Sequence, residues 1–293
     1  MRLLNASGCL DALTAPETVR ALDAFVTKTV TPLPREGNAP VRIAETDVGM
    51  LNSIGLANRG REAFLGQTLA RLASAGVSVW VSVGGFAAVE YAETCAALDA
   101  RDEVEAIELN LSCPNVDEAP ESAAEIVAAC REATRLPLFV KLSPATWDIA
   151  DSARAVEAAG ADGLALVNTI RGFALDERTL APVLGPAVGG LSGPALKPIA
   201  LAAVFACRRA TKLRIVGMGG IMNGRDALEF IACGASDIAL GTVLFTDPEA
   251  PARVRSELHA ELAAHGFSDA ENAVGCAHDA ASPVHFSPLL STG

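Results

Sequence analysis

The chain has 293 residues, of which 51% are hydrophobic and 20% are charged, and this composition is typical of a globular protein with a large apolar core. Aromatic residues make up only 4% of the chain, so aliphatic side chains must fill most of that core. The net charge of -12, without any cluster of Lys and Arg, argues against a nucleic-acid-binding protein.

The distribution of apolar residues and cysteines indicates the cellular compartment in which we expect the protein. No uncharged apolar run approaches the ~18 residues that a membrane span needs, and the first residues do not resemble a signal peptide. The seven cysteines form no Cys-x-x-Cys pair, which predicts reduced thiols in a cytoplasmic protein and argues against a metal or iron–sulfur centre held by this chain. All four histidines lie at or beyond His259, far from the candidate site described below.

Short apolar runs, which we expect to be strands, alternate with longer amphipathic segments along the chain. The expected strands are Arg2–Asn5, Ala24–Lys28, Val77–Val83, Val104–Leu109, Leu138–Leu142, Gly163–Asn168, Leu213–Gly217 and Asp237–Gly241.

The segments between these strands are expected to be helices. A closed (β/α)8 TIM barrel of the α/β class has eight strands that are each followed by a helix, and the expected elements match this number. An open doubly wound sheet is the alternative, but its Gly-x-Gly-x-x-Gly fingerprint is absent after the first strand. We expect one domain over residues 1–269 and a surface tail over residues 270–293. The expected helices are Pro16–Leu22, Arg61–Ala73, Ala87–Leu98, Ser122–Thr134, Ile149–Ala159, Ala195–Arg209, Gly224–Cys233 and Pro248–Ala264.

Two long segments rich in proline and glycine interrupt this alternation. Thr29–Asn58 and Thr169–Pro194 each show no evident helix and each follow the carboxyl end of an expected strand. Long insertions in a compact domain are usually functional, and TIM barrels build their active sites at this face. The sequence therefore predicts a barrel with long insertions around a site at the C-terminal ends of its strands.

Polar residues and glycines recur where the expected strands end. A lone lysine at a strand end usually only reaches water, but two lysines on one barrel face beside asparagines and glycine pairs favour an anionic ligand. Barrels often bind phosphate in the loops after strands seven and eight, although such glycines also make tight turns. These residues are Ser7, Lys28, Thr29, Asn110, Lys141, Asn168, Thr169, Gly219, Gly220, Gly241 and Thr242.

The stretch Ile107–Asn115 concentrates chemically active side chains at the exit of the fourth expected strand. Two carboxamides, Asn110 and Asn115, could read the edge of a planar amide-type ring without carrying charge. The thiol of Cys113 lies between them in the sequence and could transfer a proton beside that ring. The alternative is a buried structural cysteine next to turn-forming asparagines.

Several motifs together resemble the class 1 dihydroorotate dehydrogenases, in family order from Asn5 to about Phe245. Asn168-Thr169 and the Gly-Leu-Ser-Gly-Pro sequence are most similar to the NAD-linked subclass, class 1B. The motifs are Asn52–Leu56 (Asn-Ser-Ile-Gly-Leu), Asn110–Asn115 (Asn-Leu-Ser-Cys-Pro-Asn), Val140–Pro144 (Val-Lys-Leu-Ser-Pro), Asn168-Thr169, Gly189–Pro194 (Gly-Gly-Leu-Ser-Gly-Pro) and Ile215–Gly220 (Ile-Val-Gly-Met-Gly-Gly).

The resemblance implies an FMN-binding barrel that oxidises (S)-dihydroorotate to orotate in pyrimidine biosynthesis. Cys113 would be the catalytic base, which removes a proton from the ring carbon next to the one that gives its hydride to FMN. The implied substrate-binding residues are Lys28, Asn52, Ser53, Ile54, Gly55, Leu56, Asn110, Asn115, Asn168 and Thr169.

The same resemblance implies a set of FMN-binding residues. Family members usually have an asparagine on the third strand that contacts the flavin, and Ser82 stands near that position in this chain. The implied cofactor-binding residues are Ser7, Lys28, Thr29, Ser82, Asn110, Lys141, Val167, Gly193, Gly219, Gly220, Gly241 and Thr242.

The NAD-linked relatives are dimers of this type of subunit in which each copy carries a second subunit with FAD and a [2Fe-2S] cluster. The resemblance therefore implies a homodimer that passes electrons to NAD through such a partner. Three alternatives remain open. They are a fumarate-linked dihydroorotate dehydrogenase without a partner, a dihydropyrimidine dehydrogenase-type flavin module for uracil or thymine, and a flavin- or phosphate-binding barrel without catalysis. Asn115 argues against the second, in which the Cys-Pro pair is followed by His.

Overall fold

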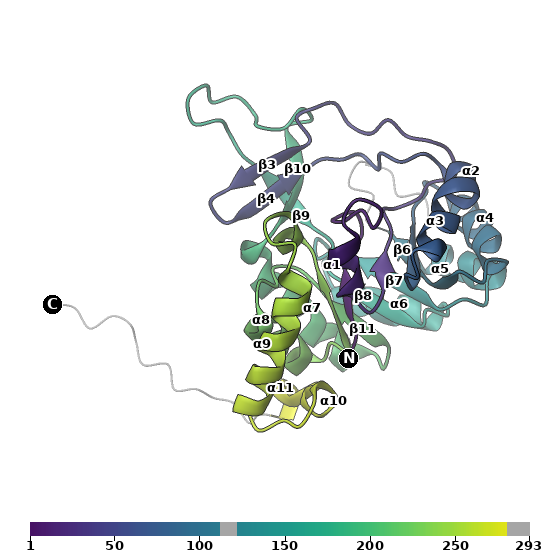
Figure 1. Ribbon diagram of the computed structural model, residues 1–293. Coiled ribbons are helices and arrows are strands. Elements are labelled where there is room, and N and C mark those ends of the chain that lie inside the picture. The colour runs from purple at the N-terminus through teal and green to yellow at the C-terminus, as the bar shows by residue number, and fades with distance from the viewer. Residues whose placement is uncertain (112–121, 280–293) are drawn as a thin grey trace.

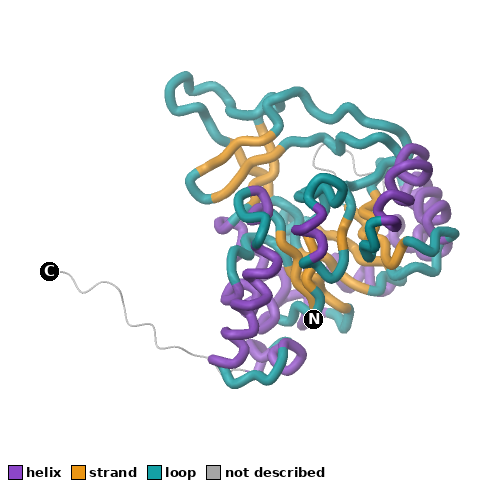
Figure 2. The backbone as a smooth tube through the Cα atoms, viewed as in Figure 1, coloured by secondary structure: helices purple, strands orange, loops and turns teal. Residues whose placement is uncertain are grey.

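The computed structural model describes residues 1–111 and 122–279, and its main sheet is a parallel barrel (Figures 1 and 2). The neighbour order is β1-β12-β11-β8-β7-β6-β5-β2, and a bridge between Leu4 and Ala24 joins β1 to β2, which closes the sheet. The expected TIM barrel is confirmed. Its strands are β1 (Leu3–Asn5), β2 (Phe25–Val26), β5 (Val79–Val83), β6 (Val104–Asn110), β7 (Leu138–Leu142), β8 (Gly163–Leu166), β11 (Arg214–Gly217) and β12 (Asp237–Leu240).

Helices follow the strands and surround the barrel, as expected (Figure 2). The expected helix Arg61–Ala73 is interrupted by a π-helical segment, Phe64–Thr68, between α2 and α3. A 3-10 turn, Pro194–Leu196, leads into α7, and a second one, Thr242–Phe245, follows β12. The helices are α1 (Pro16–Arg20), α2 (Arg61–Ala63), α3 (Leu69–Ser74), α4 (Ala88–Asp99), α5 (Ala123–Ala133), α6 (Ile149–Ala158), α7 (Lys197–Ala210), α8 (Gly224–Cys233) and α9 (Ala250–Ala264).

Local sequence signals fix several of these helix ends. Ser122 and Glu125 form a capping box at the start of α5, and the side chain of Asp148 accepts hydrogen bonds from the first amides of α6. Asn223 caps α8 in the same way, and Gly234 ends that helix in the left-handed conformation with φ 115°. The caps satisfy amide groups that the helix itself leaves unpaired.

Two apolar layers hold the barrel together. The larger layer lies between strands and helices, and the smaller one fills the barrel interior with one or two residues from each strand. Small and large side chains alternate there, which allows a narrow barrel to pack without voids. The interior residues are Leu4, Ala24, Val26, Trp80, Ala106, Phe139, Ala165, Val216, Met218 and Ala239.

The two insertions form a second sheet that the sequence did not predict. Its antiparallel strands are β3 (Ile43–Thr46), β4 (Gly49–Asn52), β9 (Ile170–Phe173) and β10 (Val188–Ser192), in the order β3-β4-β10-β9. In Figure 1 this sheet stands above the barrel. It therefore covers part of the face at which the barrel strands end.

The first residues of the expected tail are helical and pack on the barrel. α10 (Ala270–Ala273) and α11 (Cys276–Asp279) both contact α8, and Ala273 is fully buried. The His278 ring stacks on Phe205 with 4.0 Å between ring centroids. Residues 280–293 lie outside the described part of the chain. Among the described helices, none is both long and apolar enough to cross a membrane.

Candidate active site

A cavity of about 730 Å³ lies at the carboxyl ends of the barrel strands and is also lined by residues of the second sheet. This volume lies within the range of about 300–1,000 Å³ that is common for ligand pockets. Its walls contain most of the residues expected from the sequence to bind substrate or cofactor. They are Ser7, Lys28, Thr29, Asn52, Ser53, Ile54, Gly55, Leu56, Asn110, Lys141, Val167, Asn168, Thr169, Gly193, Gly219, Gly220, Gly241 and Thr242.

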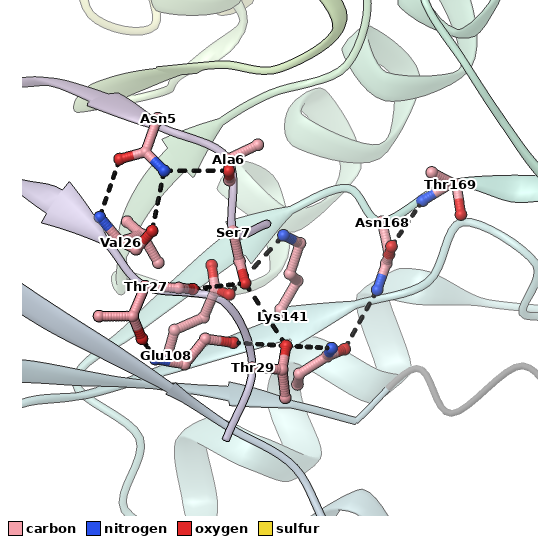
Figure 3. A network of polar contacts seen from close by, with 12 residues as sticks. Asn5, Ala6, Ser7, Val26, Thr27, Thr29, Glu108, Lys141, Asn168 and Thr169 are labelled. Atoms are coloured by element: carbon pink, nitrogen blue, oxygen red, sulfur yellow. Dashed lines mark hydrogen bonds and ion pairs between the residues drawn. The ribbon is translucent and has the colours of Figure 1, made fainter. Parts of the chain in front are cut away.

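Thr29 is the centre of the polar network on the cavity floor (Figure 3). Its hydroxyl lies 3.0 Å from that of Ser82 and 3.4 Å from that of Ser7, and it accepts a hydrogen bond of 3.1 Å from the Asn110 amide. The Ser7 hydroxyl in turn donates to the carbonyl of Thr27 at 2.8 Å. Because three strand ends share this hydroxyl, their side chains are held in fixed positions.

The carboxamides at the exits of β6 and β8 form one chain of hydrogen bonds. The Asn168 amide donates to Asn110 Oδ1 at 3.1 Å, and Asn168 Oδ1 accepts from the amide of Thr169 at 2.8 Å. Figure 3 shows how this chain continues the network from Thr29. Each carboxamide is therefore fixed in orientation and offers its remaining donor or acceptor to a ligand.

Asn52 reaches the cavity from the second sheet. Its amide donates to the carbonyl of Gly190 at 3.3 Å, across the β4–β10 pair. An added Cβ on Gly190 would come within 2.1 Å of the Thr169 hydroxyl. The glycine thus lets the second sheet approach the end of β8 closely, and this brings Asn52 to the same cavity as Asn168.

Two lysines give the cavity a positive floor. Lys141 is 5% exposed, and its ammonium group lies 3.7 Å from the carboxylate of Glu108. Lys28 packs its stem against Gly8, where an added Cβ would lie 3.0 Å from Lys28 Cδ. Burial lowers the pKa of Lys28, and the charge of Lys141 lowers it further. Burial also raises the pKa of the Cys9 thiol, which lines the same cavity.

Three glycines in the loops after β11 and β12 present free backbone amides. Gly219 and Gly220 have φ values of 119° and 82°, a conformation that favours glycine. The N–H groups of these two residues and of Gly241 donate no hydrogen bond to any described residue, and all three residues line the cavity. Such amides form an anion site in barrels.

Three expected site residues are not found in the cavity wall: one lies behind it, and two lie outside the described residues. Ser82 is fully buried and does not line the cavity; its hydroxyl contacts that of Thr29 instead. Cys113 and Asn115 fall in the segment 112–121, which lies outside the described residues.

The cavity also contains residues that the sequence analysis did not select, including Arg35 and Arg171. The Arg35 guanidinium lies 4.7 Å from the centre of the Phe86 ring. In the sequence, each of these arginines is only a charged residue within a long insertion, and such residues usually lie on the solvated surface.

Replacing Thr29 with valine is expected to lower the free energy of unfolding by about 1–3 kcal/mol, because the amide of Asn110 and the hydroxyl of Ser82 lose their partner in a buried site. Urea denaturation of the purified chain measures the change. Thr29→Ser keeps the hydroxyl and should retain most of the stability. An unchanged free energy of unfolding in Thr29→Val, together with a loss in Thr29→Ser, would show that the methyl group matters and the hydroxyl does not.

The sequence matches the family model described as dihydroorotate dehydrogenase over residues 2–262. This match spans most of the chain. The chain belongs to the dihydroorotate dehydrogenase family. The sequence resemblance is therefore confirmed at the level of the family, and the cavity lies in the part of the chain that the family model covers.

Similar proteins within the dihydroorotate dehydrogenase family carry two kinds of name. The dihydroorotate dehydrogenase B (NAD(+)) catalytic subunit of Desulforamulus reducens is 45% identical over 264 residues, which cover 88% of this chain and 87% of that protein. The subunit of the same name from Trichlorobacter lovleyi is 44% identical over 87% of this chain and 86% of its own length. A protein of Solibacter usitatus, 42% identical over 88% and 87%, is named putative dihydroorotate dehydrogenase A (fumarate).

Proposed function

We propose that this chain is the catalytic subunit of an NAD-linked dihydroorotate dehydrogenase, which oxidises (S)-dihydroorotate to orotate in pyrimidine biosynthesis. One observation carries the proposal: the carboxamides of Asn52, Asn110 and Asn168 line a single cavity together with the buried Lys141 and the half-buried Lys28. Relatives about 45% identical over most of the chain bear the corresponding name.

The residues that are present fit FMN. Free amides at Gly219, Gly220 and Gly241 suit its phosphate, and the ammonium group of Lys141 suits the end of the flavin that becomes negative on reduction. When bound, FMN supplies the hydride acceptor. Ser82 then acts by holding Thr29 in position, which leaves Thr29 to contact the cofactor.

The carboxamides of Asn52, Asn110 and Asn168 orient the pyrimidine ring of the substrate. Each can donate and accept hydrogen bonds, as the alternating N–H and C=O groups of the ring require. Gly55 and Leu56 also line the cavity and suit the ring carboxylate through their backbone amides. Lys28 also lines the cavity and supplies a second cation, which would compensate the negative charge of the substrate.

Cys113 completes the proposed reaction as the general base. Its thiolate takes a proton from one ring carbon while the neighbouring carbon gives up a hydride, and a carbon–carbon double bond forms between them. A free thiol has a pKa of about 8.5, and a cation beside a thiol lowers this value and makes the thiolate available at neutral pH. This assignment rests on the motif Asn110–Asn115, because Cys113 lies outside the described residues.

Anaerobic mixing of the purified chain with dihydroorotate tests the proposal. We expect bound FMN to lose its visible absorbance. Dihydrouracil, which lacks the carboxylate, should bleach the flavin poorly; the reverse preference would favour a dihydropyrimidine dehydrogenase. A flavin that neither compound bleaches would favour a barrel that has lost catalysis.

The proposed partner is a second subunit with FAD and a [2Fe-2S] cluster, bound to a homodimer of this chain in the cytoplasm. The six described cysteines are free thiols, and no group of three or more His, Cys, Asp or Glu in residues 1–111 and 122–279 could hold a metal ion. Electrons therefore need another carrier to reach NAD.

We expect the isolated chain to reduce NAD slowly even though dihydroorotate reduces its FMN quickly. Addition of the partner subunit should accelerate NAD reduction, and fumarate should be a poor acceptor. Turnover with each acceptor, measured with and without the partner, checks this expectation. Fast turnover with fumarate by the chain alone would favour the fumarate-linked alternative, a name that one relative carries.

A further inference from the structure

Glu108 is a carboxylate in the interior of the barrel. It lies on β6 between Ile107 and Leu109, and only 2% of its surface is exposed. Alternate residues of a strand share a face, so Glu108 points to the same side as Ala106, which belongs to the interior core, and Asn110, which lines the cavity. Glu108 itself does not line the cavity and therefore lies below its floor.

The partner of Glu108 is Lys141 on the neighbouring strand. In the β6–β7 register Lys141 stands opposite Asn110, so Glu108 lies one step deeper in the barrel. The two charged groups are 3.7 Å apart and almost completely buried, and Figure 3 shows them beside the polar network of Thr29. Glu108 Oε1 accepts no hydrogen bond from any described residue. The contact is therefore a charge–charge interaction without a matched hydrogen bond.

Such a pair is a weak source of folding stability. Burying two charges is costly, and only good geometry with additional hydrogen bonds repays that cost. The geometry here does not meet that condition, because one carboxylate oxygen lacks a hydrogen-bond partner. The pair's effect on its surroundings is larger, because charges act strongly over short distances in a medium of low dielectric constant.

The surroundings contain a second cation. This second cation is Lys28. Burial and the charge of Lys141 lower the pKa of Lys28, and the charge of Glu108 opposes this shift. Glu108 thus offsets one of the two ammonium groups at the floor of the cavity.

We propose that Glu108 is a positioning residue for Lys141 that also limits the positive charge under the flavin, and that it thereby sets the reduction potential of bound FMN. This inference rests on the proposed function, because it requires FMN in the cavity. Positive charge next to the flavin stabilises its anionic reduced form. Glu108 therefore keeps the potential lower than the two lysines alone would set it.

The test is the midpoint potential of FMN in the purified wild-type chain and in Glu108→Gln, which removes the charge and keeps the shape. We expect the potential to rise by about 30 mV, which is a tenfold change in the equilibrium constant of a two-electron couple. Sulfite, which adds to flavin as an anion, gives a second readout: its dissociation constant should fall about tenfold.

Two further variants make the result specific. Glu105→Gln removes a carboxylate from the same strand, but one that pairs with Arg2 at the exposed end of the barrel, and it should leave the potential unchanged. Glu108→Asp keeps the charge on a shorter arm and should raise the potential less than Glu108→Gln. It also provides a measurement if the glutamine variant does not fold.

A potential that is unchanged or lower in Glu108→Gln would overturn the inference, even if the variant were less stable, since a purely structural role moves stability and leaves the potential alone. If dihydroorotate bleached the FMN of the wild-type chain but Glu108→Gln left the midpoint potential unchanged, this inference alone would be refuted. Wild-type chain that binds no FMN would refute the proposed function, and this inference with it.

Discussion

Replacement of Cys113 with alanine is expected to slow the bleaching of bound FMN by dihydroorotate by about 10²–10⁴-fold, the usual contribution of a positioned general base. FMN should stay bound, because the implied FMN contacts do not include this thiol. Stopped-flow absorbance under anaerobic conditions measures the rate. The effect should be confined to the proton-transfer step, so a spectroscopic titration with orotate should show an almost unchanged affinity.

Cys276→Ala is the matched control. It removes a thiol from α11, and Cys276 is not among the residues that line the cavity. It should bleach at the wild-type rate. A Cys113→Ala variant that also bleached at that rate would remove the thiol from the mechanism and assign the base to another group. Loss of FMN from Cys113→Ala would instead indicate a structural role.

Replacement of Gly220 with alanine is expected to lower the affinity for FMN at least about tenfold, which corresponds to about 1.4 kcal/mol. The φ value of 82° disfavours any side chain. The added Cβ would also lie 2.8 Å from the carbonyl oxygen of Gly193 and 2.9 Å from the amide nitrogen of Lys197. The loop must move to relieve these contacts, and its amides then leave the position that suits the phosphate.

Gly266→Ala separates backbone strain from this local clash. Gly266 has a similar φ of 79°, and no atom lies within 4 Å of its added Cβ. The control should lose some thermal stability and keep its FMN, as measured by the flavin-to-protein ratio after dialysis. If Gly220→Ala kept its full flavin content, the loop after β11 would not be the phosphate site.

The barrel was predictable from sequence because its signals are local. Each strand is a short apolar run, and Leu138–Leu142 and α8 have the predicted boundaries. The positions of Asn110 and Lys141, at the carboxyl ends of β6 and β7, follow from where each strand ends. The conserved geometry of a closed parallel sheet then brings the ends of distant strands to one face.

The second sheet was missed because its glycines indicated turns. Gly189 and Gly190 lie within β10, where they allow close approach: an added Cβ on Gly189 would lie 2.6 Å from the carbonyl oxygen of Asn52. Close contact between segments more than a hundred residues apart has no local signal. For the same reason the sequence could not show that Ser82 lies behind Thr29.

Glu108 had a sequence signal, since it is a charged residue between two apolar residues, Ile107 and Leu109, in an expected strand. Its significance depends on Lys141, which lies on the next strand and reaches it only in the folded barrel. Pairing of charges across strands requires the register, and the sequence does not supply it.

A crystal structure of the chain with FMN and orotate would show whether one cavity holds both ligands. We expect the phosphate at Gly219 and Gly220, the flavin next to Lys141, and the orotate ring among Asn52, Asn110 and Asn168 with the sulfur of Cys113 facing it. Orotate bound elsewhere, or a Cys113 sulfur turned into aliphatic packing with no space for a ring beside it, would contradict the proposed function.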